Sequence, residues 1–356
     1  MKLPQRLSLV AQTAVVLREQ IVRGVWPRFL PGEGEFCAKL HVSRVTLRAA
    51  LAILQREGLI RSSQGKRREV VKRRRRLLAA SNHRVVLVMP SPLHTLSPNA
   101  VFWVGALREY LAEAGHHLDV QVNRTAYGYG QGNILKSMME QERASGWVIY
   151  RSTEPMQRWF SERKLPCVIT GSRYPGVEMP SVDIAYRAVC RHAVGRFLVH
   201  GHRQLVLLNP ASGAAGDIES EQGFHEAVNN SGRSEVRAEV VRHNGTVNGL
   251  TYKLDALLRR PQPPTGFFVS RPEHVLTVAS QLLRHGRRLP QDVALISRDD
   301  APFLEHFVPS IARYVFDPKV FARRISKAVL DMADGASVKP VDHQILPRFS
   351  SGQTLG

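Results

Sequence analysis

The chain has 356 residues, of which 43% are hydrophobic and 22% are charged. This is an ordinary globular composition that excludes a disordered chain, and the length suggests two or three domains. The net charge is +20, and residues 1–80 hold 18 Lys or Arg against 5 Asp or Glu. A charge of +13 in less than a quarter of the chain indicates a basic module that binds a polyanion, joined to a more neutral part.

The sequence gives no sign of a metal site, a cofactor site or a membrane segment. Cys37, Cys167 and Cys190 are far apart and none has CxxC spacing, which favours a reducing cytosol over a disulfide scaffold. The glycine-rich stretch at 127–132 lacks a following GK[ST] and is interpreted as a loop. No apolar run approaches 18 residues. We therefore expect a cytoplasmic protein without metal, cofactor or membrane contact.

Residues 1–72 are predicted to form a small helical domain with a hairpin. Apolar spacing indicates an amphipathic helix at 8–23, ending at Gly24, rather than an export signal. A connector with two prolines leads to helices at 33–40 and 44–57, with a tight turn between them. Ser43 is placed to cap the third helix. After Gly58 the pattern reads strand, turn, strand, with basic residues following the turn.

The third helix has one apolar side and one basic stripe. Leu47, Ala50, Leu51 and Leu54 share a side that should pack on the first two helices. Arg44, Arg48 and Gln55 lie on a neighbouring stripe expected to face outward. Helix, turn, helix and basic hairpin make a winged helix-turn-helix, whose second helix can enter a DNA major groove. The structural alternative is that the two arginines are merely solvated.

Residues 21–71 carry a family resemblance. The segments VSRVTLRAAL and LQREGLI match the DNA-binding domain of the GntR family almost residue for residue. The resemblance implies that Arg44 and Arg48 contact the operator and that Gly65 is the wing glycine. We expect the DNA-binding residues to be the following: Ser43, Arg44, Thr46, Arg48, Gly65, Lys66, Arg67 and Arg68. Gly32 and Gly34 depart from the family's LPSERELA pattern, so base preference should differ.

Residues 73–83 form a basic linker that begins within the run KRRRR at 72–76. Such a run is a solvated linker, a phosphate clamp or a non-specific nucleic-acid patch. We interpret it as a linker whose charges also contact DNA.

Residues 84–356 alternate short apolar runs with helical patterns of 10–15 residues, starting with RVVLVMP at 84–90. This alternation predicts an α/β domain of two lobes with parallel sheets and helices on both faces. A ligand would bind at the carboxyl ends of the strands, between the lobes. Helices are expected near 99–114, 133–144, 155–163, 186–200, 220–231, 248–259, 273–285 and 318–334.

The same region resembles the effector domain of the LacI family, which has the type I periplasmic-binding-protein fold. The stretch from 285 to 335, with LPQDVALISRDD at its centre, follows the family's pattern, as do LPCVITGSR and ILPRFSSGQT. A GntR DNA-binding module with a LacI-like effector domain is the layout of the arabinose-repressor type. The resemblance therefore implies a homodimer that binds DNA and a small molecule.

Pocket positions depart from the family more than the scaffold does. The family's Arg is replaced by Ser220, and an Asn-Asp pair by Arg271 and Pro272, while the family's Asp is retained as Asp299. Arg271 either pairs with an anionic group or is a plain surface arginine. Asp299 either accepts from a ligand or caps the helix at 300–306. The expected effector residues are Phe102, Arg173, Ser220, Arg271 and Asp299.

These patterns predict a transcriptional regulator, expected to be a repressor, that binds an operator as a homodimer and a sugar or sugar acid between two lobes. One alternative is a ligand-independent regulator with a degenerate sensor. Another is a carbohydrate-acting enzyme with a basic appendage, which is disfavoured because no catalytic constellation appears.

Overall fold

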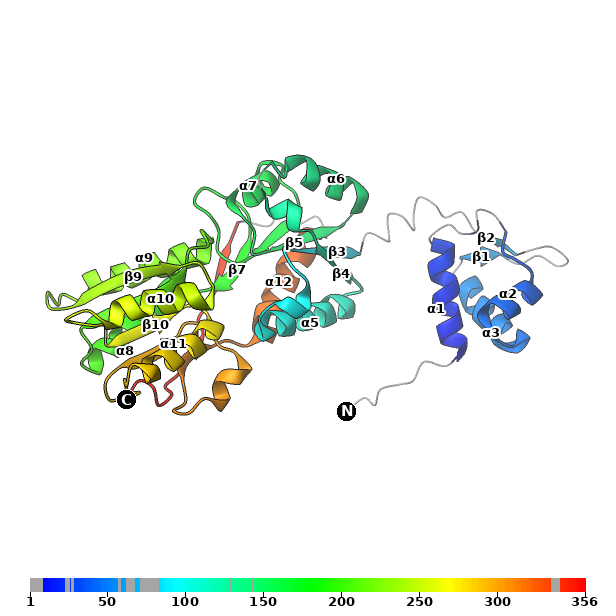
Figure 1. The fold of residues 1–356 in the computed structure, drawn as a ribbon. Helices are drawn as coiled ribbons and strands as arrows, with labels where there is room; N and C mark the ends of the chain where they lie inside the picture. Colours follow the sequence, from blue (N-terminus) through cyan, green and yellow to red (C-terminus); the bar gives the residue numbers. More distant parts are fainter. Residues whose placement is uncertain are drawn as a thin grey trace. The chain divides into compact units, whose positions relative to one another are not determined.

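The computed structural model describes residues 9–22, 26, 29–56, 59–61, 68–70, 83–128, 130–142, 144–333 and 340–356. The chain divides into two compact units, Met1–Ser81 and Asn82–Gly356 (Figure 1). The predicted stops at Gly24 and Gly58, the wing residues Gly65, Lys66 and Arg67, and all of the predicted linker except His83 lie outside the described residues.

The first unit packs three helices against a two-stranded antiparallel ribbon. Its elements are α1 (Leu9–Val22), α2 (Glu33–Leu40), α3 (Arg44–Arg56), β1 (Ile60–Arg61) and β2 (Glu69–Val70). The predicted apolar side of α3 is confirmed, because Leu47, Ala50, Leu51 and Leu54 are fully buried with side chains from α1 and α2. His41 has a left-handed backbone conformation that ends α2 and makes the predicted tight turn. This core fixes the orientation of α3.

The second unit contains two six-stranded sheets, as the two-lobed α/β prediction requires (Figure 1). The first sheet has the order β13-β7-β6-β5-β3-β4 and the second β14-β12-β11-β10-β8-β9. The first lobe contains β3 (Arg84–Met89), α5 (Pro98–Glu113), β4 (His117–Val122), α6 (Gly132–Glu142), β5 (Gly146–Tyr150), α7 (Glu154–Glu162), β6 (Cys167–Thr170), β7 (Ser181–Ile184), α12 (Pro318–Ala333) and β13 (Asp342–Ile345). The second lobe contains α8 (Tyr186–Val199), β8 (Gln204–Pro210), α9 (Ala215–Asn229), β9 (Arg237–His243), α10 (Val247–Leu258), β10 (Gly266–Val269), α11 (Pro272–Arg284), β11 (Ala294–Ser297), β12 (Ala312–Val315) and β14 (Arg348–Ser350).

Both sheets are buried on two faces, which explains why their central strands are apolar throughout. In β3, Val85, Leu87 and Met89 pack with α5 and α12, whereas Val86 and Val88 pack with α6 and α7. The same division occurs along β8, whose alternate residues face α8 and α9 on one side and α10 and α11 on the other. The chain crosses between the lobes three times: after β7, after β12 and after β13.

Three short strands were not predicted. β7 and β13 pair with each other in parallel at the edge of the first sheet. β14 pairs antiparallel with β12, whereas we expected parallel sheets only. These strands have three or four residues each and include Asp, His, Gln or Arg, so they lack the apolar signal of the inner strands. Helix α9 also begins at Ala215, about five residues earlier than predicted.

Helices α8 and α9 approach so closely that Gly223 leaves no space for a side chain. A Cβ at this position would lie 2.7 Å from the Cα of Arg187. We therefore expect Gly223→Ala to lower the free energy of unfolding by about 1–3 kcal/mol, since overpacking outweighs the better helix propensity of alanine. Urea denaturation measures this change.

Gly195 of α8 provides the matched control, because a Cβ there would meet no atom within 4 Å. Gly195→Ala should raise the free energy of unfolding by about 0.5–1 kcal/mol. Equal effects of the two substitutions would contradict the close approach at Gly223.

Candidate functional site

The first candidate site is the exposed start of α3. Ser43 caps the helix as predicted, because its Oγ accepts a hydrogen bond of 3.1 Å from the backbone N–H of Thr46. The Ser43 and Thr46 hydroxyls are also 2.9 Å apart, so the Thr46 hydroxyl already has a local partner. The cap and the buried leucine face together hold the first turns of α3 in one place.

Arg44 and Arg48 project from this helix into solvent, as the helical wheel indicated. The sequence pattern indicates no ion-pair partner for either arginine, but Arg48 has one. The Nε of Arg48 donates to Glu33 of α2 at 2.9 Å, although 66% of the Arg48 side chain is exposed. Arg68 donates to the other oxygen of the same carboxylate at 2.9 Å. Within the described part of the first unit, Arg44 has no ion-pair partner.

Val45 is a residue of this surface that the sequence reasoning missed. Its side chain is 79% exposed in the first turn of α3, between Arg44 and Thr46. An apolar side chain gains nothing from this position in water, but it suits contact with a thymine methyl group in a major groove. The signal available in the sequence was a β-branched residue on the polar side of the helix.

The second candidate site is a cleft of about 270 Å³ between the two lobes of the second unit. It lies where the strands of both sheets end, which is the position expected for open parallel sheets. Its first-lobe wall is aromatic: Trp103 lies 5.5 Å from Tyr150 and 5.6 Å from Phe321, measured between ring centroids. Its second-lobe wall is charged and includes Asp217, Arg271, Arg298 and Asp299.

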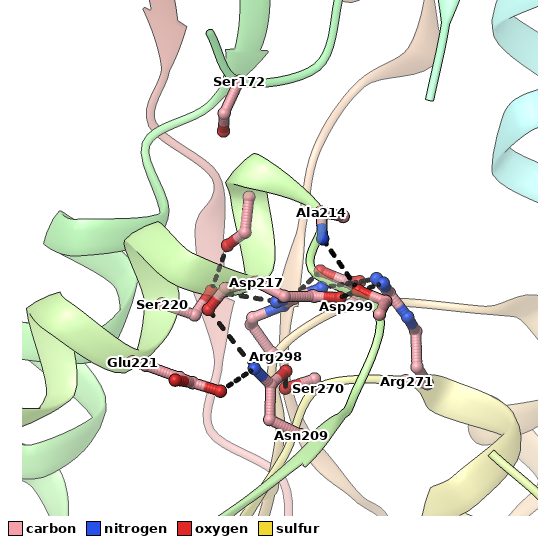
Figure 2. A network of polar contacts seen from close by, with 12 residues as sticks. Ser172, Asn209, Ala214, Asp217, Ser220, Glu221, Ser270, Arg271, Arg298 and Asp299 are labelled. Carbon is pink, nitrogen blue, oxygen red and sulfur yellow. Dashed lines mark hydrogen bonds and ion pairs between the residues drawn. The ribbon is translucent and has the colours of Figure 1, made fainter. Parts of the chain in front are cut away.

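Arg298 is the centre of the charged wall, and Figure 2 shows it between two carboxylates. Its guanidinium lies 3.0 Å from Asp217 and 2.9 Å from Asp299 and donates to Ser220 at 2.9 Å, while the side chain is only 1% exposed. It also lies 4.3 Å from the ring centroid of Tyr186, a favourable cation–π arrangement. Burial with these partners makes Arg298 a fixed part of the wall.

Arg271 extends the same network toward the cleft opening. Its guanidinium lies 2.8 Å from Asp217 and 3.6 Å from Asp299. Asp217 receives a further hydrogen bond of 2.6 Å from the Ser212 hydroxyl. The nearby guanidiniums of Arg298 and Arg271 keep the pKa of Asp217 below its ordinary value despite its burial. The two arginines and two aspartates therefore form a charge-balanced cluster.

Asp183, at the end of β7, behaves differently from these aspartates. Burial raises its pKa to about 7, even though it accepts hydrogen bonds from the Ser172 hydroxyl and the backbone N–H of Ile184. Asp183 lines the cleft and also a neighbouring cavity of about 260 Å³, on the side of Arg173 and Arg187.

Among the described residues, two side-chain hydrogen bonds cross from one lobe to the other. The side-chain amide of Asn99 in α5 donates to the backbone carbonyl of Asp300 at 2.8 Å. The Tyr174 hydroxyl donates to the backbone carbonyl of Gly213 at 2.9 Å. The lobes are thus joined by polar contacts as well as by the three chain crossings.

The structure brings only some of the predicted effector residues together. Arg271 and Asp299 line the cleft. Arg173 lines the neighbouring cavity, where its Nη1 donates to the carbonyls of Met179 and Pro340. Phe102 is exposed on α5 and lies outside the cleft lining, in which its neighbour Trp103 takes part. Ser220 is buried, and its hydroxyl contacts Arg298 and the Gly216 carbonyl instead of the cleft.

Arg298 and Asp217 are cleft residues that the sequence reasoning missed. An arginine directly after the buried strand ALIS was the one available signal, because a buried cation needs partners. Among the described residues, no three His, Cys, Asp or Glu side chains are grouped closely enough to hold a metal ion. Over the same residues, no helix has the length and apolar character needed to cross a bilayer.

The raised pKa of Asp183 predicts a pH-dependent stability. Between about pH 4 and pH 7 the folded state holds a proton that the unfolded chain releases, so the free energy of unfolding contributed by this group falls as the pH rises through that window. Asp183→Asn does not titrate; its amide oxygen can accept from the Ile184 N–H while its NH2 group donates to the Ser172 hydroxyl oxygen. It should be more stable than the parent protein at pH 8, and urea denaturation should show this gain shrinking toward pH 5.

Asp292→Asn is the control for this experiment. The exposed Asp292 has a pKa lowered to about 2 by its bonds to Arg288, so its substitution should bring no gain at pH 8. A gain for Asp183→Asn that is equally large at both pH values would contradict the assignment.

Two family models match the chain. The model described as bacterial regulatory proteins, gntR family, matches residues 9–70, which include α1 to β2. The model described as a periplasmic binding protein-like domain matches residues 194–355. This range covers most of the second lobe together with α12 and β13 of the first lobe. The winged helix-turn-helix and two-lobed fold predictions are confirmed by these matches.

The similar curated proteins are bacterial transcriptional regulators. The chain is 23% identical to the HTH-type transcriptional regulator CelR of Thermobifida fusca over 219 residues, which is 58% of this chain and 64% of CelR. The chain thus spans slightly less than two thirds of that relative. It is also 23% identical to the HTH-type transcriptional repressor CytR of Escherichia coli K12 over 233 residues, 63% of this chain and 67% of CytR.

Solved structures share the fold. The transcriptional regulator CelR–cellobiose complex has a TM-score of 0.67 at 20% identity, covering 99% of this chain and 100% of that one. A LacI-type regulator structure from Bacillus cereus has a TM-score of 0.68 at 18% identity, covering 76% of this chain and 97% of that one. The chain therefore carries a domain of the gntR family of bacterial regulatory proteins, followed by a periplasmic binding protein-like domain of the kind found in LacI-family regulators.

Proposed function

We propose that this protein is a ligand-responsive transcriptional regulator, acting as a repressor, that binds operator DNA. The observation that carries the proposal is the exposed pair Arg44 and Arg48 at the start of a capped helix whose opposite face is fully buried. A rigid helix with two outward guanidiniums fits the major groove, where arginine can bond to guanine O6 and N7. The gntR-family match over the same residues supports this interpretation.

The remaining expected DNA contacts follow from the same geometry. The start of α3 at Ser43 presents a positive dipole end to a phosphate, while the backbone N–H of Thr46 is already capped by Ser43. Arg68 directly precedes the wing strand β2, and in the sequence it follows the predicted wing residues Gly65, Lys66 and Arg67. We propose that the protein binds a near-palindromic operator as a homodimer, because two identical modules read two half-sites. This activity belongs in the cytoplasm, where genomic DNA is accessible.

The cleft is proposed to bind a neutral polyhydroxylated molecule such as a sugar. An aromatic wall suits the apolar face of a sugar ring, and the Arg271–Asp299 side offers neighbouring donors and acceptors for hydroxyl groups. The charge of Arg271 is balanced by its ion pairs with Asp217 and Asp299. This argues against the alternative that Arg271 binds an anionic ligand such as a sugar acid. The CelR structure with cellobiose provides a precedent for a sugar in this fold.

Two other functions are less well supported. A ligand-independent regulator with a degenerate sensor is less well supported because the cleft between the lobes is lined by polar side chains that a ligand could contact. A carbohydrate-acting enzyme is disfavoured because the relatives are transcriptional regulators.

Substitution of Arg44 tests the DNA-binding proposal. Operator fragments are first isolated by incubating the full-length protein with fragmented genomic DNA. We expect Arg44→Ala to lose about 1–3 kcal/mol of binding free energy on the selected operator, with a relaxed preference at one base position. Arg191→Ala, on the exposed side of α8 in the other unit, is the control and should bind as the parent does. An equal loss on all sequences would identify Arg44 as a phosphate contact instead.

Effector binding tests the second half of the proposal. A thermal-shift screen should include neutral mono- and disaccharides together with sugar acids, and a neutral sugar should raise the melting temperature most. Titration calorimetry of that sugar, with and without operator, should then give affinities that differ by about 5–150-fold, the range of ordinary coupling energies. Identical affinities would remove the coupling and leave a DNA-binding protein with an independent sugar site.

A further inference from the structure

Glu33 joins three elements of the DNA-binding unit through one carboxylate. It is the first residue of α2, and its two oxygens accept from Arg48 of α3 and from Arg68 next to β2, each at 2.9 Å. A backbone hydrogen bond of 2.9 Å from the Leu30 N–H to the Arg68 carbonyl fixes the same strand to the segment before α2. Glu33 therefore links α3 to the residue before β2, in addition to the core that these elements share.

In this contact, one nitrogen of the Arg48 guanidinium is hydrogen-bonded to Glu33 and the other two are not. Glu33 accepts from the Nε of Arg48, whereas neither Nη atom has a hydrogen-bond partner among the described residues, and the side chain is 66% exposed. The guanidinium is planar with a fixed fork of donors, so holding one edge sets the direction of the other. A free arginine would have to lose its rotamer freedom on binding, whereas an arginine held by Glu33 has lost part of it beforehand.

We propose that Glu33 is a positioning residue for sequence recognition, which orients the free edge of Arg48 toward a base and lowers the attraction of this surface for DNA of any sequence. The inference rests on the proposed DNA-binding function. Both effects raise the ratio of specific to non-specific affinity, because a carboxylate beside the groove weakens phosphate binding while the oriented guanidinium keeps its base contact.

The pKa of Glu33 is lowered by its bonds to Arg68 and Arg48, so the carboxylate is ionised at neutral pH. Glu35 offers a matched comparison two residues further along α2. It is exposed and pairs only with Lys39 of its own helix, at 2.8 Å. Replacing either glutamate by glutamine removes one negative charge, but only Glu33→Gln changes the surroundings of Arg48.

The experiment selects duplexes from a random-sequence pool with the full-length protein. The parent and Glu35→Gln should enrich the same motif. Glu33→Gln should bind unselected duplex at least as tightly as Glu35→Gln does, yet lose about tenfold of the preference at one base position in each half-site. In an Arg48→Ala background, Glu33→Gln should cause no further loss of preference, because Glu33 acts through Arg48.

Circular dichroism establishes that each variant is folded. If Glu33→Gln is not folded, Arg48→Lys tests the same geometry, because a single ammonium cannot contact Glu33 and a base edge in the fixed arrangement of a guanidinium. Arg48→Lys should lose the sequence preference at the same base position. Retention of the full motif by Glu33→Gln, or by Arg48→Lys where that variant is used, overturns the positioning role alone. A parent protein that enriches no motif overturns the proposed function, and the role of Glu33 with it.

Discussion

The buried guanidinium of Arg298 is the interaction around which the cleft is built. A cation that is 1% exposed is tolerated only if it is neutralised and hydrogen-bonded, because desolvation of an unpaired charge costs several kcal/mol. Its partners come from different elements: Asp217 and Ser220 from α9, Tyr186 from α8 and Asp299 from the residues after β11. Removing Arg298 would leave the buried Asp217 with Arg271 as its one remaining ion-pair partner among the described residues. The position of one side chain therefore fixes how two helices and a strand end meet at the cleft.

The same charge balance limits what the cleft can bind. A wall whose arginines and aspartates are already paired offers oriented donors and acceptors but little net field, so it distinguishes ligands by hydrogen-bond geometry. The two bonds between lobes, from Asn99 and from Tyr174, are each worth about 0.5–1.5 kcal/mol. Their sum is of the same order as ordinary coupling energies between sites. A ligand that contacts both lobes therefore needs only a modest differential affinity to change the balance between lobe arrangements.

The sequence was sufficient wherever a local pattern determined the structure. The leucine face of α3, the Ser43 cap and the inner strands of both sheets follow from periodicity and capping rules that act over a few residues. It was insufficient where distant residues meet. β7 and β13 are short and polar and exist because they pair across about 160 residues of chain. Glu33 lies 15 residues from Arg48, and Asp217 lies 81 residues from Arg298, so neither of these two pairings can be read from neighbouring residues.

Arginine has a different role in each of the two units, and the exposure of its side chain determines that role. Arg48 and Arg298 are both held by carboxylates at about the same distance, but the first is mostly in solvent and the second has almost no contact with it. Water screens the Arg48 pair, so that pair adds little stability and its free donors remain available to a polyanion. The Arg298 pairs are unscreened, and all of their donors face protein groups. One pairing therefore orients a group for recognition, whereas the other gives a ligand cleft its fixed wall.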